Sequence, residues 1–149
     1  MRFAFRVLSY PDFVSRPQQA AAIPIRRRGT DLQVCLIRKR LSGSWGIPKG
    51  TVDSGDTHET TALKEAWEEA GVRGRLVGDS LGSYQYEKYG RALTVTVYVM
   101  EVLEHQRDWE EAGIRERKWA SFEEAGELLI EHPAHTFLGP ALRLFSVDA

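Results

Sequence analysis

Residues 50–72 read GTVDSGDTHETTALKEAWEEAGV, a glycine-bearing loop followed by an acidic segment. Glu65, Glu68 and Glu69 are three and four residues apart, so a helix with about 3.6 residues per turn places them on one face. Like charges on one helical face repel each other, and a bound cation relieves that repulsion. Hard carboxylate oxygens favour Mg²⁺, with Mn²⁺ as a second candidate. The simpler alternative is a solvated acidic face.

The same stretch predicts where its helix begins and ends. Asp56 can cap the N-terminus, with Glu59 three residues later in the capping-box position. Gly71 suits the left-handed residue that ends a helix. The apolar stripe of the predicted helix consists of Ala62, Leu63, Ala66 and Trp67.

Charge is unevenly distributed along the chain, although the net charge is only −1. Residues 1–49 hold ten Lys or Arg and two acids, a balance of +8. Residues 50–72 hold six acids and one Lys, a balance of −5, and residues 73–149 hold nine bases and thirteen acids, a balance of −4. A basic segment before an acidic helix suits a ligand that touches both, such as a polyphosphate with Mg²⁺.

Size and composition indicate a globular protein. We expect one domain over residues 1–149, because 149 residues is a common domain size and 42% of them are hydrophobic. The single cysteine, Cys35, lies in an apolar run and is predicted in the core. No stretch approaches the ~20 apolar residues of a membrane helix, so we expect a cytoplasmic protein that makes no membrane contact. The arginine-bearing residues 1–8 predict an edge strand or a loose arm, with a transit peptide as the alternative.

The remaining segments predict an α+β domain, a mixed sheet with helices against it. We expect strands over residues 19–25, 32–37, 81–89, 92–102 and 114–119, and an irregular strand and loop over residues 43–50. The first two strands predict one hairpin, and the third and fourth predict another. Pro24 favours an end or edge position for the first strand. Ser121 begins a helix through Leu129, and residues 134–145 predict a last helix.

Residues 50–72 resemble the signature of the Nudix hydrolases. Six positions match the family pattern outright: Gly50, Glu65, Glu68, Glu69, Gly71 and Val72. Asp56 stands where the family has Glu, and Lys64 stands where it has Arg. In the family these two side chains brace the loop against the helix. Both changes keep the charge, so we expect Asp56 and Lys64 to form this structural brace, more loosely because Lys lacks the fork of Arg.

This resemblance implies a fold, a cofactor and a mechanism. The fold is the Nudix α/β/α sandwich with a mixed central sheet. The expected metal ligands are Glu65, Glu68, Glu69 and the carbonyl of Gly50, which hold Mg²⁺. The reaction is hydrolysis of a nucleoside diphosphate linked to another group. The clustered carboxylates raise one another's pKa, so one of them can act as the general base; Glu69 is preferred, then Glu65.

A narrower resemblance is to the hydrolases of diphosphoinositol polyphosphates and diadenosine polyphosphates. It rests on several runs: residues 45–50 (WGIPKG), 68–74 (EEAGVRG), 97–99 (VYV), 108–111 (DWEE), 115–119 (RERKW) and 121–125 (SFEEA). Animal members carry a basic stretch before the first core strand, and here residues 16–19 (RPQQ) hold fewer cations. That departure favours nucleoside polyphosphates. The expected partner is a small-molecule polyphosphate, a triphosphorylated RNA 5′ end is less favoured, and the chain is a monomer or homodimer.

Basic residues near the signature are candidates for substrate contacts. Lys49 adjoins the predicted metal loop, and Arg38, Arg40 and Arg115 are further candidates for phosphate binding. Trp45, Tyr84 and Tyr86 can stack on a base, although alternating aromatic residues more often belong to the core. His132 and His135 are expected on the surface.

Two other functions compete with hydrolysis. One is a catalytically silent Nudix domain that binds a nucleotide as a sensor. The other is a structural α+β domain whose acidic cluster is only a solvated face.

Overall fold

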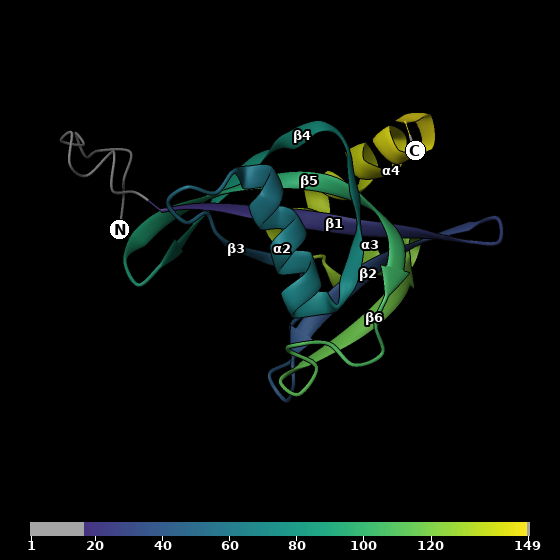
Figure 1. Ribbon diagram of the computed structural model, residues 1–149, viewed down its shortest axis with the longest axis horizontal. Helices are drawn as coiled ribbons and strands as arrows, with labels where there is room; N and C mark the ends of the chain where they lie inside the picture. Colours follow the sequence, from purple (N-terminus) through teal and green to yellow (C-terminus); the bar gives the residue numbers. More distant parts are fainter. Residues whose placement is uncertain (1–16, 149) are drawn as a thin grey trace.

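The computed structural model describes residues 17–148, so the predictions for residues 1–8 and for Arg16 lie outside the described residues. Figure 1 shows the arrangement of the elements along the chain. The elements are β1 (Gln18–Arg28), β2 (Asp31–Lys39), β3 (Lys49–Thr51), α2 (His58–Ala70), β4 (Val72–Lys88), β5 (Arg91–His105), β6 (Arg115–Ser121), α3 (Phe122–Leu128), the 3-10 helix η2 (Pro133–Phe137) and α4 (Leu138–Asp148).

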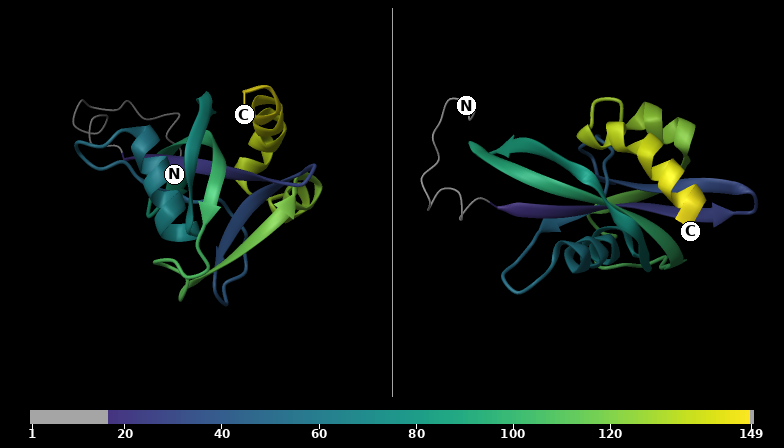
Figure 2. Two further views of the ribbon diagram at one scale, coloured as in Figure 1. Left: turned by 45° about the vertical axis from the view of Figure 1, so that its right-hand side comes forward. Right: turned by 90° about the horizontal axis from the view of Figure 1, so that it is seen from above.

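The strands form one mixed sheet, as the sequence predicts. Its order is β4-β5-β1-β2-β6, and β3 pairs with β1 beside this path. The β1–β5 pair is parallel and the other pairs are antiparallel. Helix α2 covers one face, and α3 and α4 cover the other (Figure 2). The predicted α+β architecture with helices on both faces of a mixed sheet is confirmed.

Alternation along β1 supplies both halves of the core. Successive side chains of a strand point to opposite faces. Ala20 and Ala22 belong to the cluster under α2, whereas Ile23 and Ile25 belong to the cluster under α3 and α4. Cys35 lies in the α2 cluster, fully buried and unpaired, as predicted. Burial raises the pKa of its thiol to about 12.

The prediction that Pro24 marks an edge strand is wrong, because β1 is central. Pro24 pairs with Met100 on the β5 side. On the opposite side, β3 pairs with residues 19–21 and β2 pairs with residues 25–28. Pro24 therefore faces a gap between two partner strands, where the N–H that proline lacks is not needed.

The two ends of α2 differ in how well they were predicted. The N-cap is Thr57, one residue after the predicted Asp56, and Thr60 completes its capping box in place of Glu59. Each threonine side chain bonds to the backbone of the other, and these bonds satisfy N–H groups that the helix leaves free. At the other end, Gly71 adopts the predicted left-handed conformation, with φ 67° and ψ 31°.

The remaining elements differ from their predicted bounds in length. Strand β4 begins directly after Gly71 and is longer than predicted, with a register shift between Val77 and Gly82. The single predicted C-terminal helix is divided into η2 and α4. Pro140 lies in the first turn of α4, where a missing N–H costs no helical hydrogen bond.

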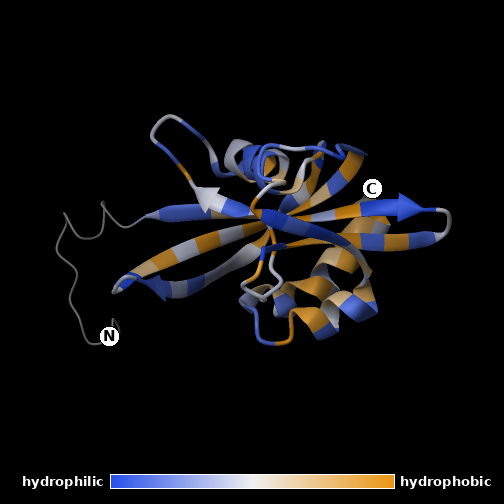
Figure 3. Cartoon of the chain, turned by 90° about the horizontal axis from the view of Figure 1, so that it is seen from below, coloured by the Kyte–Doolittle hydropathy of each residue, from blue (hydrophilic) through white to orange (hydrophobic). Residues whose placement is uncertain are grey.

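Hydropathy follows this layered arrangement. Apolar residues gather where the helices meet the sheet, and the tip of the β1–β2 hairpin is hydrophilic (Figure 3). None of the helices described for residues 17–148 combines the length and the hydrophobicity needed to cross a membrane.

Candidate active site

The site begins where β3 delivers the chain towards α2. A β-carbon built on Gly50 would lie 2.3 Å from the carboxyl carbon of Glu65. Real β-carbons do not come this close to another heavy atom, so Glu65 can rest against this backbone only because residue 50 is glycine. The local sequence thereby places a helical carboxylate directly beside the backbone of Gly50.

Glu69 is the most buried of the three acids on α2, with 9% of its surface exposed. One carboxylate oxygen accepts a hydrogen bond from the Lys49 backbone N–H at 3.1 Å. The other oxygen lies 3.2 Å from Arg115 Nη2. The Glu65 carboxyl group lies close enough to that of Glu69 for each to influence the pKa of the other. Glu69 is therefore held by two donors and faces a second acid.

Burial raises the pKa of both carboxyl groups. Desolvation raises the pKa of Glu69 to about 7, although Arg115 and the Lys49 N–H act in the opposite direction. Desolvation and then the charge of Glu68 raise the pKa of Glu65. A carboxyl group that titrates near neutral pH can accept a proton under physiological conditions.

The loop between β5 and β6 fastens the C-terminal half of α2. Trp109 Nε1 donates a hydrogen bond to the Glu69 carbonyl at 2.9 Å. The Glu111 backbone N–H donates to the Glu68 carbonyl at 3.2 Å. The Glu111 carboxylate pairs with Arg115 at 2.5 Å, so the arginine bridges two acids. This loop therefore fixes both the helix backbone and the position of Arg115.

Helix α2 ends in a contact that the sequence did not predict. The helix has no basic residue in its last turn, where a cation is favourable. Arg117 of β6 supplies one by donating to the Ala70 carbonyl at 2.7 Å. Its guanidinium stacks on Trp109, 4.3 Å from the ring centroid. Only the folded chain brings these residues together.

A second acidic group adjoins the first. Ligand oxygens of Glu68, Glu110 and Glu111 lie within 4.8 Å of one another. The sequence predicted Glu68 as a ligand but assigned no role to Glu110 or Glu111. The only signal was the run at residues 108–111, which contributed to the family resemblance. Both acidic groups offer carboxylate oxygens, a donor set that fits Mg²⁺ or Mn²⁺.

Lys49 lies beside these acids without a carboxylate partner in the described part of the chain. Its ammonium donates to the Tyr86 hydroxyl at 2.9 Å and to Gln19 Oε1 at 3.4 Å. The Tyr86 hydroxyl in turn donates to Gln19 Oε1 at 2.8 Å. Neutral oxygens orient this cation but leave its charge uncompensated, which favours a nearby anion.

The predicted phosphate contacts divide into two groups. Lys49, Arg38 and Arg115 line a common cavity of about 290 Å³, together with Lys39. Within this group, Arg38 is also paired with Glu116 at 3.1 Å. Arg40 does not line the cavity, and its guanidinium donates to the Ala112 carbonyl from two nitrogens, at 3.2 and 3.0 Å.

Aromatic and imidazole side chains form the wall of this cavity. Trp45 lines it, with Arg38 lying 4.5 Å from the indole centroid. Tyr84 and Tyr86 pack against the core, which agrees with the structural alternative for these residues. His132, which was expected on the surface, is only partly exposed, because it lines the same cavity.

Comparison with known proteins identifies the family. A family model described as NUDIX domain matches residues 16–145, most of the chain. The chain belongs to the Nudix family. Diphosphoinositol polyphosphate phosphohydrolase 3-beta of Bos taurus is 31% identical over 121 residues, which cover 79% of this chain and 73% of the relative. Nudix hydrolase 4 of Arabidopsis thaliana is 34% identical over 99 residues, which cover 65% of this chain.

That plant relative is longer, and the match spans only 47% of its length. Among solved structures, an Ap4A hydrolase of C. elegans superposes with a TM-score of 0.66 at 23% identity, covering 88% of this chain and 96% of that one. At this identity the likeness shows the Nudix fold. These relatives match the branch that the sequence resembles.

The two departures from the Nudix signature lie next to each other. Lys64 Nζ is 3.9 Å from an Asp56 oxygen and 3.8 Å from an Asp53 oxygen. All three side chains are more than 40% exposed, so solvent screens these pairs. The lysine shares its charge between two acids of the Nudix loop, which is consistent with a brace looser than a forked arginine pair.

Proposed function

We propose that this chain is a Mg²⁺-dependent pyrophosphohydrolase that cleaves a nucleoside diphosphate linked to another group. One observation carries the proposal: Glu65 rests against the Gly50 backbone and Glu69 accepts from the Lys49 backbone N–H, next to a cavity lined by cations. Carboxylates that could bind a metal therefore lie next to cationic side chains that could bind phosphates. We further propose that residues 1–149 act as one cytoplasmic domain.

Three carboxylates on α2 would hold the metal in this proposal. Glu65, Glu68 and Glu69 supply side-chain oxygens, and the carbonyl of Gly50 supplies a backbone oxygen. The group they hold would polarise phosphate oxygens and lower the pKa of a water. Glu110 and Glu111 lie close enough to Glu68 to add ligands from the β5–β6 loop.

Glu69 is our candidate for the general base, with Glu65 as the second choice. Its pKa of about 7 suits a group that must be ionised before it accepts a proton from water. Arg115 and the Lys49 N–H hold its two oxygens in place. A fixed carboxylate loses little entropy when it acts, which is favourable for catalysis.

Lys49, Arg38 and Arg115 are the proposed phosphate contacts. Lys49 has the strongest case, because no acid in the described residues neutralises it and Tyr86 orients it. Arg115 already joins Glu69 to Glu111, so it would position the base as well as contact substrate. Arg40 is left out of this set because it does not line the cavity and two of its nitrogens donate to the Ala112 carbonyl.

The relatives support two substrate classes, dinucleoside polyphosphates and diphosphoinositol polyphosphates. One relative is named for each: an Ap4A hydrolase and a diphosphoinositol polyphosphate phosphohydrolase. A triphosphorylated RNA end is a third, less favoured substrate. Each contains the phosphoric anhydride bond that this chemistry requires.

The test is hydrolysis by purified protein with Mg²⁺ across a substrate panel. The panel holds diadenosine polyphosphates, diphosphoinositol polyphosphates, ADP-ribose, NADH and nucleoside triphosphates, with products separated by chromatography. We expect one class to be preferred, and the product pair then shows which phosphorus is attacked. EDTA should stop the reaction.

A nucleotide sensor is the competing function. It predicts binding without turnover for every member of the panel, with or without Mg²⁺. The complete set of acids at residues 65, 68 and 69 favours hydrolysis, because a sensor has no need of a general base. Absence of turnover across the panel would favour the nucleotide sensor over the hydrolase.

A further inference from the structure

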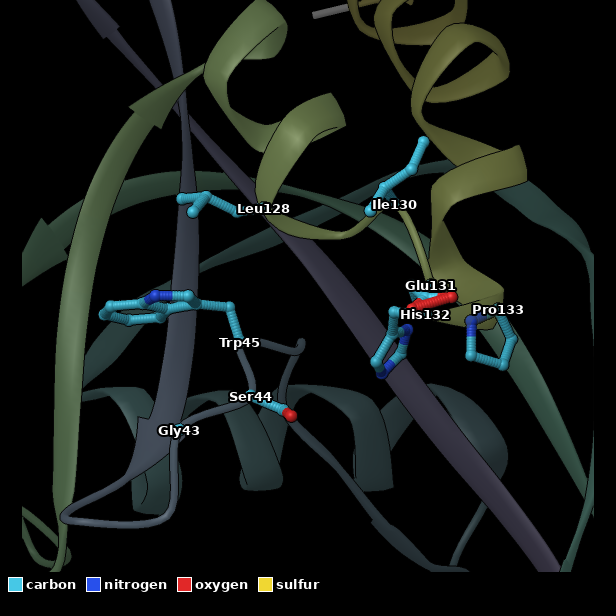
Figure 4. Close-up of a pocket in the computed structure, with 8 residues that line it drawn as sticks. All are labelled: Gly43, Ser44, Trp45, Leu128, Ile130, Glu131, His132 and Pro133. Atoms are coloured by element: carbon cyan, nitrogen blue, oxygen red, sulfur yellow. The ribbon is translucent and has the colours of Figure 1, made fainter.

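A second cavity opens beside the cationic one. It has a volume of about 380 Å³ and is lined chiefly by Trp45, Leu128, Ile130, Glu131, His132 and Pro133. Figure 4 shows Trp45 and His132 on opposite sides of it, with Leu128 and Ile130 above. This volume lies in the range of about 300–1,000 Å³ that is typical of small-molecule sites. We call it the Trp45–His132 pocket.

The two cavities adjoin each other but differ in charge. They share Ser44, Trp45 and His132 in their linings. The first cavity carries the cations Arg38, Lys39, Lys49 and Arg115. The lining of the Trp45–His132 pocket contains no lysine or arginine and has one acid, Glu131. A ligand that spans both would therefore be anionic at one end and uncharged at the other.

The Nε2 nitrogen of His132 is a hydrogen-bond donor. Its Nδ1 accepts a hydrogen bond from the Ala134 backbone N–H at 2.9 Å, so the proton of the neutral ring lies on Nε2. Burial and then the charge of Lys49 lower the pKa of His132, which keeps the ring neutral. Nε2 lies close to Gly46, because a β-carbon built on that glycine would be 3.2 Å from Nε2. The donor thus lies at the border between the two cavities.

We propose that the Trp45–His132 pocket binds the nucleobase of a nucleoside polyphosphate and selects it over a polyphosphorylated inositol. The inference rests on the proposed function, which places the phosphate chain in the cationic cavity. A nucleobase is uncharged and planar, so it can contact the indole, Leu128 and Ile130. Its polar edge can pair with the His132 donor and the Glu131 acceptor.

An inositol ring with several phosphates fits this pocket poorly. It presents phosphate groups in every direction, and those facing the pocket would meet Glu131 with no cation to pair with. Moving a phosphate from water to this largely apolar lining costs free energy when no cation pairs with it, and the like charge of Glu131, although exposed and partly screened by solvent, adds repulsion. The pocket therefore discriminates chiefly by rejecting the charged ligand.

The first test reverses the charge of the pocket. Glu131→Lys should raise the ratio of kcat/KM for a diphosphoinositol polyphosphate to that for a diadenosine polyphosphate by about tenfold, because it replaces repulsion with attraction. Glu127→Lys is the matched control, since Glu127 is also exposed but does not line the pocket. The control should leave the ratio unchanged.

The second test removes the donor and keeps the local fold. Asparagine at position 132 can still accept from the Ala134 N–H but withdraws the Nε2 donor. His132→Asn should raise KM for the diadenosine polyphosphate about tenfold and leave the inhibition constant of inorganic tripolyphosphate, a competitor that has no base, unchanged. Equal changes for both compounds would overturn the pocket assignment.

A binding measurement separates this inference from the proposed function. The δ1-methyl signal of Ile130, which lines the Trp45–His132 pocket but not the cationic cavity, is identified by its loss in Ile130→Val and should shift with AMP but not with inositol hexakisphosphate. If that shift occurs without hydrolysis of any substrate, the pocket is supported and the proposed hydrolysis fails. If hydrolysis occurs but Glu131→Lys and His132→Asn leave substrate preference unchanged, or inositol hexakisphosphate shifts the signal as AMP does, the pocket is refuted and hydrolysis stands.

Discussion

The two faces of the sheet are packed with side chains of different size. Under α2 the cluster is rich in alanine, with Ala20 and Ala22 of β1 facing Ala62, Ala66 and Ala70 of the helix. Under α3 and α4 the cluster consists mainly of larger side chains: Ile23, Ile25, Leu36, Leu129, Leu138, Phe145 and several valines. Large apolar side chains bury more surface and contribute more to stability.

This difference indicates that the α2 face positions the site and that the opposite face contributes more to stability. Small side chains let α2 lie close to β1 and β3, which brings Glu65 against Gly50 and Glu69 against the Lys49 backbone. Close packing leaves the helix little room to move, so this face holds the carboxylates in fixed positions. The opposite face carries no predicted metal ligand and supplies most of the large buried side chains. Substitutions on the two faces should therefore fail in different ways.

The largest expected effect is on the α2 face. Glu69→Gln should lower turnover by about 10²–10⁴-fold, because an amide can neither act as a base nor carry the negative charge of a ligand. Thermal stability should change little, because the amide oxygen can still accept from Lys49 and the lost Arg115 pair is offset by removal of a carboxylate that is costly to bury. The measurements are kcat and Tm of the purified variant. Glu59→Gln, at an exposed acid in the first turn of the same helix, is the control and should retain full turnover.

The next largest effect is a loss of stability on the opposite face. Phe145 is fully buried, so Phe145→Ala should lower the free energy of unfolding by about 3–5 kcal/mol through lost burial and a cavity. Turnover should stay near the wild-type value at temperatures where the variant is folded. Denaturant titration and kcat at low temperature check both points.

Val147 provides the comparison for Phe145. It lies on the same helix with 81% of its surface exposed, so Val147→Ala should change stability by less than about 0.5 kcal/mol. A Phe145→Ala variant that is folded but inactive would show that the two faces do not have separate roles.

A smaller effect sharpens the comparison at the contact between Gly50 and Glu65. Gly50→Ala places a β-carbon where Glu65 now lies, and the flexible carboxylate must move. A displacement of about 1 Å at a reacting group can cost roughly 100-fold, so turnover should fall by up to that factor. Stability should fall less, because the fold can keep its core.

The control for Gly50 is Gly126, which lies in α3 with open space around its α-carbon. Gly126→Ala should stabilise the protein by about 0.5–1 kcal/mol through helix propensity and leave turnover unchanged. Full activity of Gly50→Ala would mean that Glu65 does not need its present position.

Local patterns in the sequence predicted much of this structure. The β1–β2 and β4–β5 hairpins follow from turn residues between alternating strands, and Gly71 ends α2 as its position suggested. The helical spacing of Glu65 and Glu69 also placed both side chains in one contact. Each of these depends on residues that are close together in the chain.

The errors arose where distant segments meet. Pro24 is tolerated in a central strand because β2 and β3 leave a gap beside it, and a gap of this kind exists only in the folded sheet. His132 lines a cavity because the segment after α3 folds back over Trp45. Arg117 serves α2 from strand β6. Sequence spacing carries no signal for contacts of this kind, because tertiary packing decides them.

The central claim is that the α2 face holds carboxylates in position for a divalent cation. The most direct measurement is calorimetric titration of Mn²⁺ into the wild-type protein and into Glu65→Gln. We predict a saturable binding heat for the wild type and an affinity at least about tenfold weaker for the variant. No saturable heat in the wild type, or equal affinity in both proteins, would contradict the account and leave the acidic cluster as a solvated face.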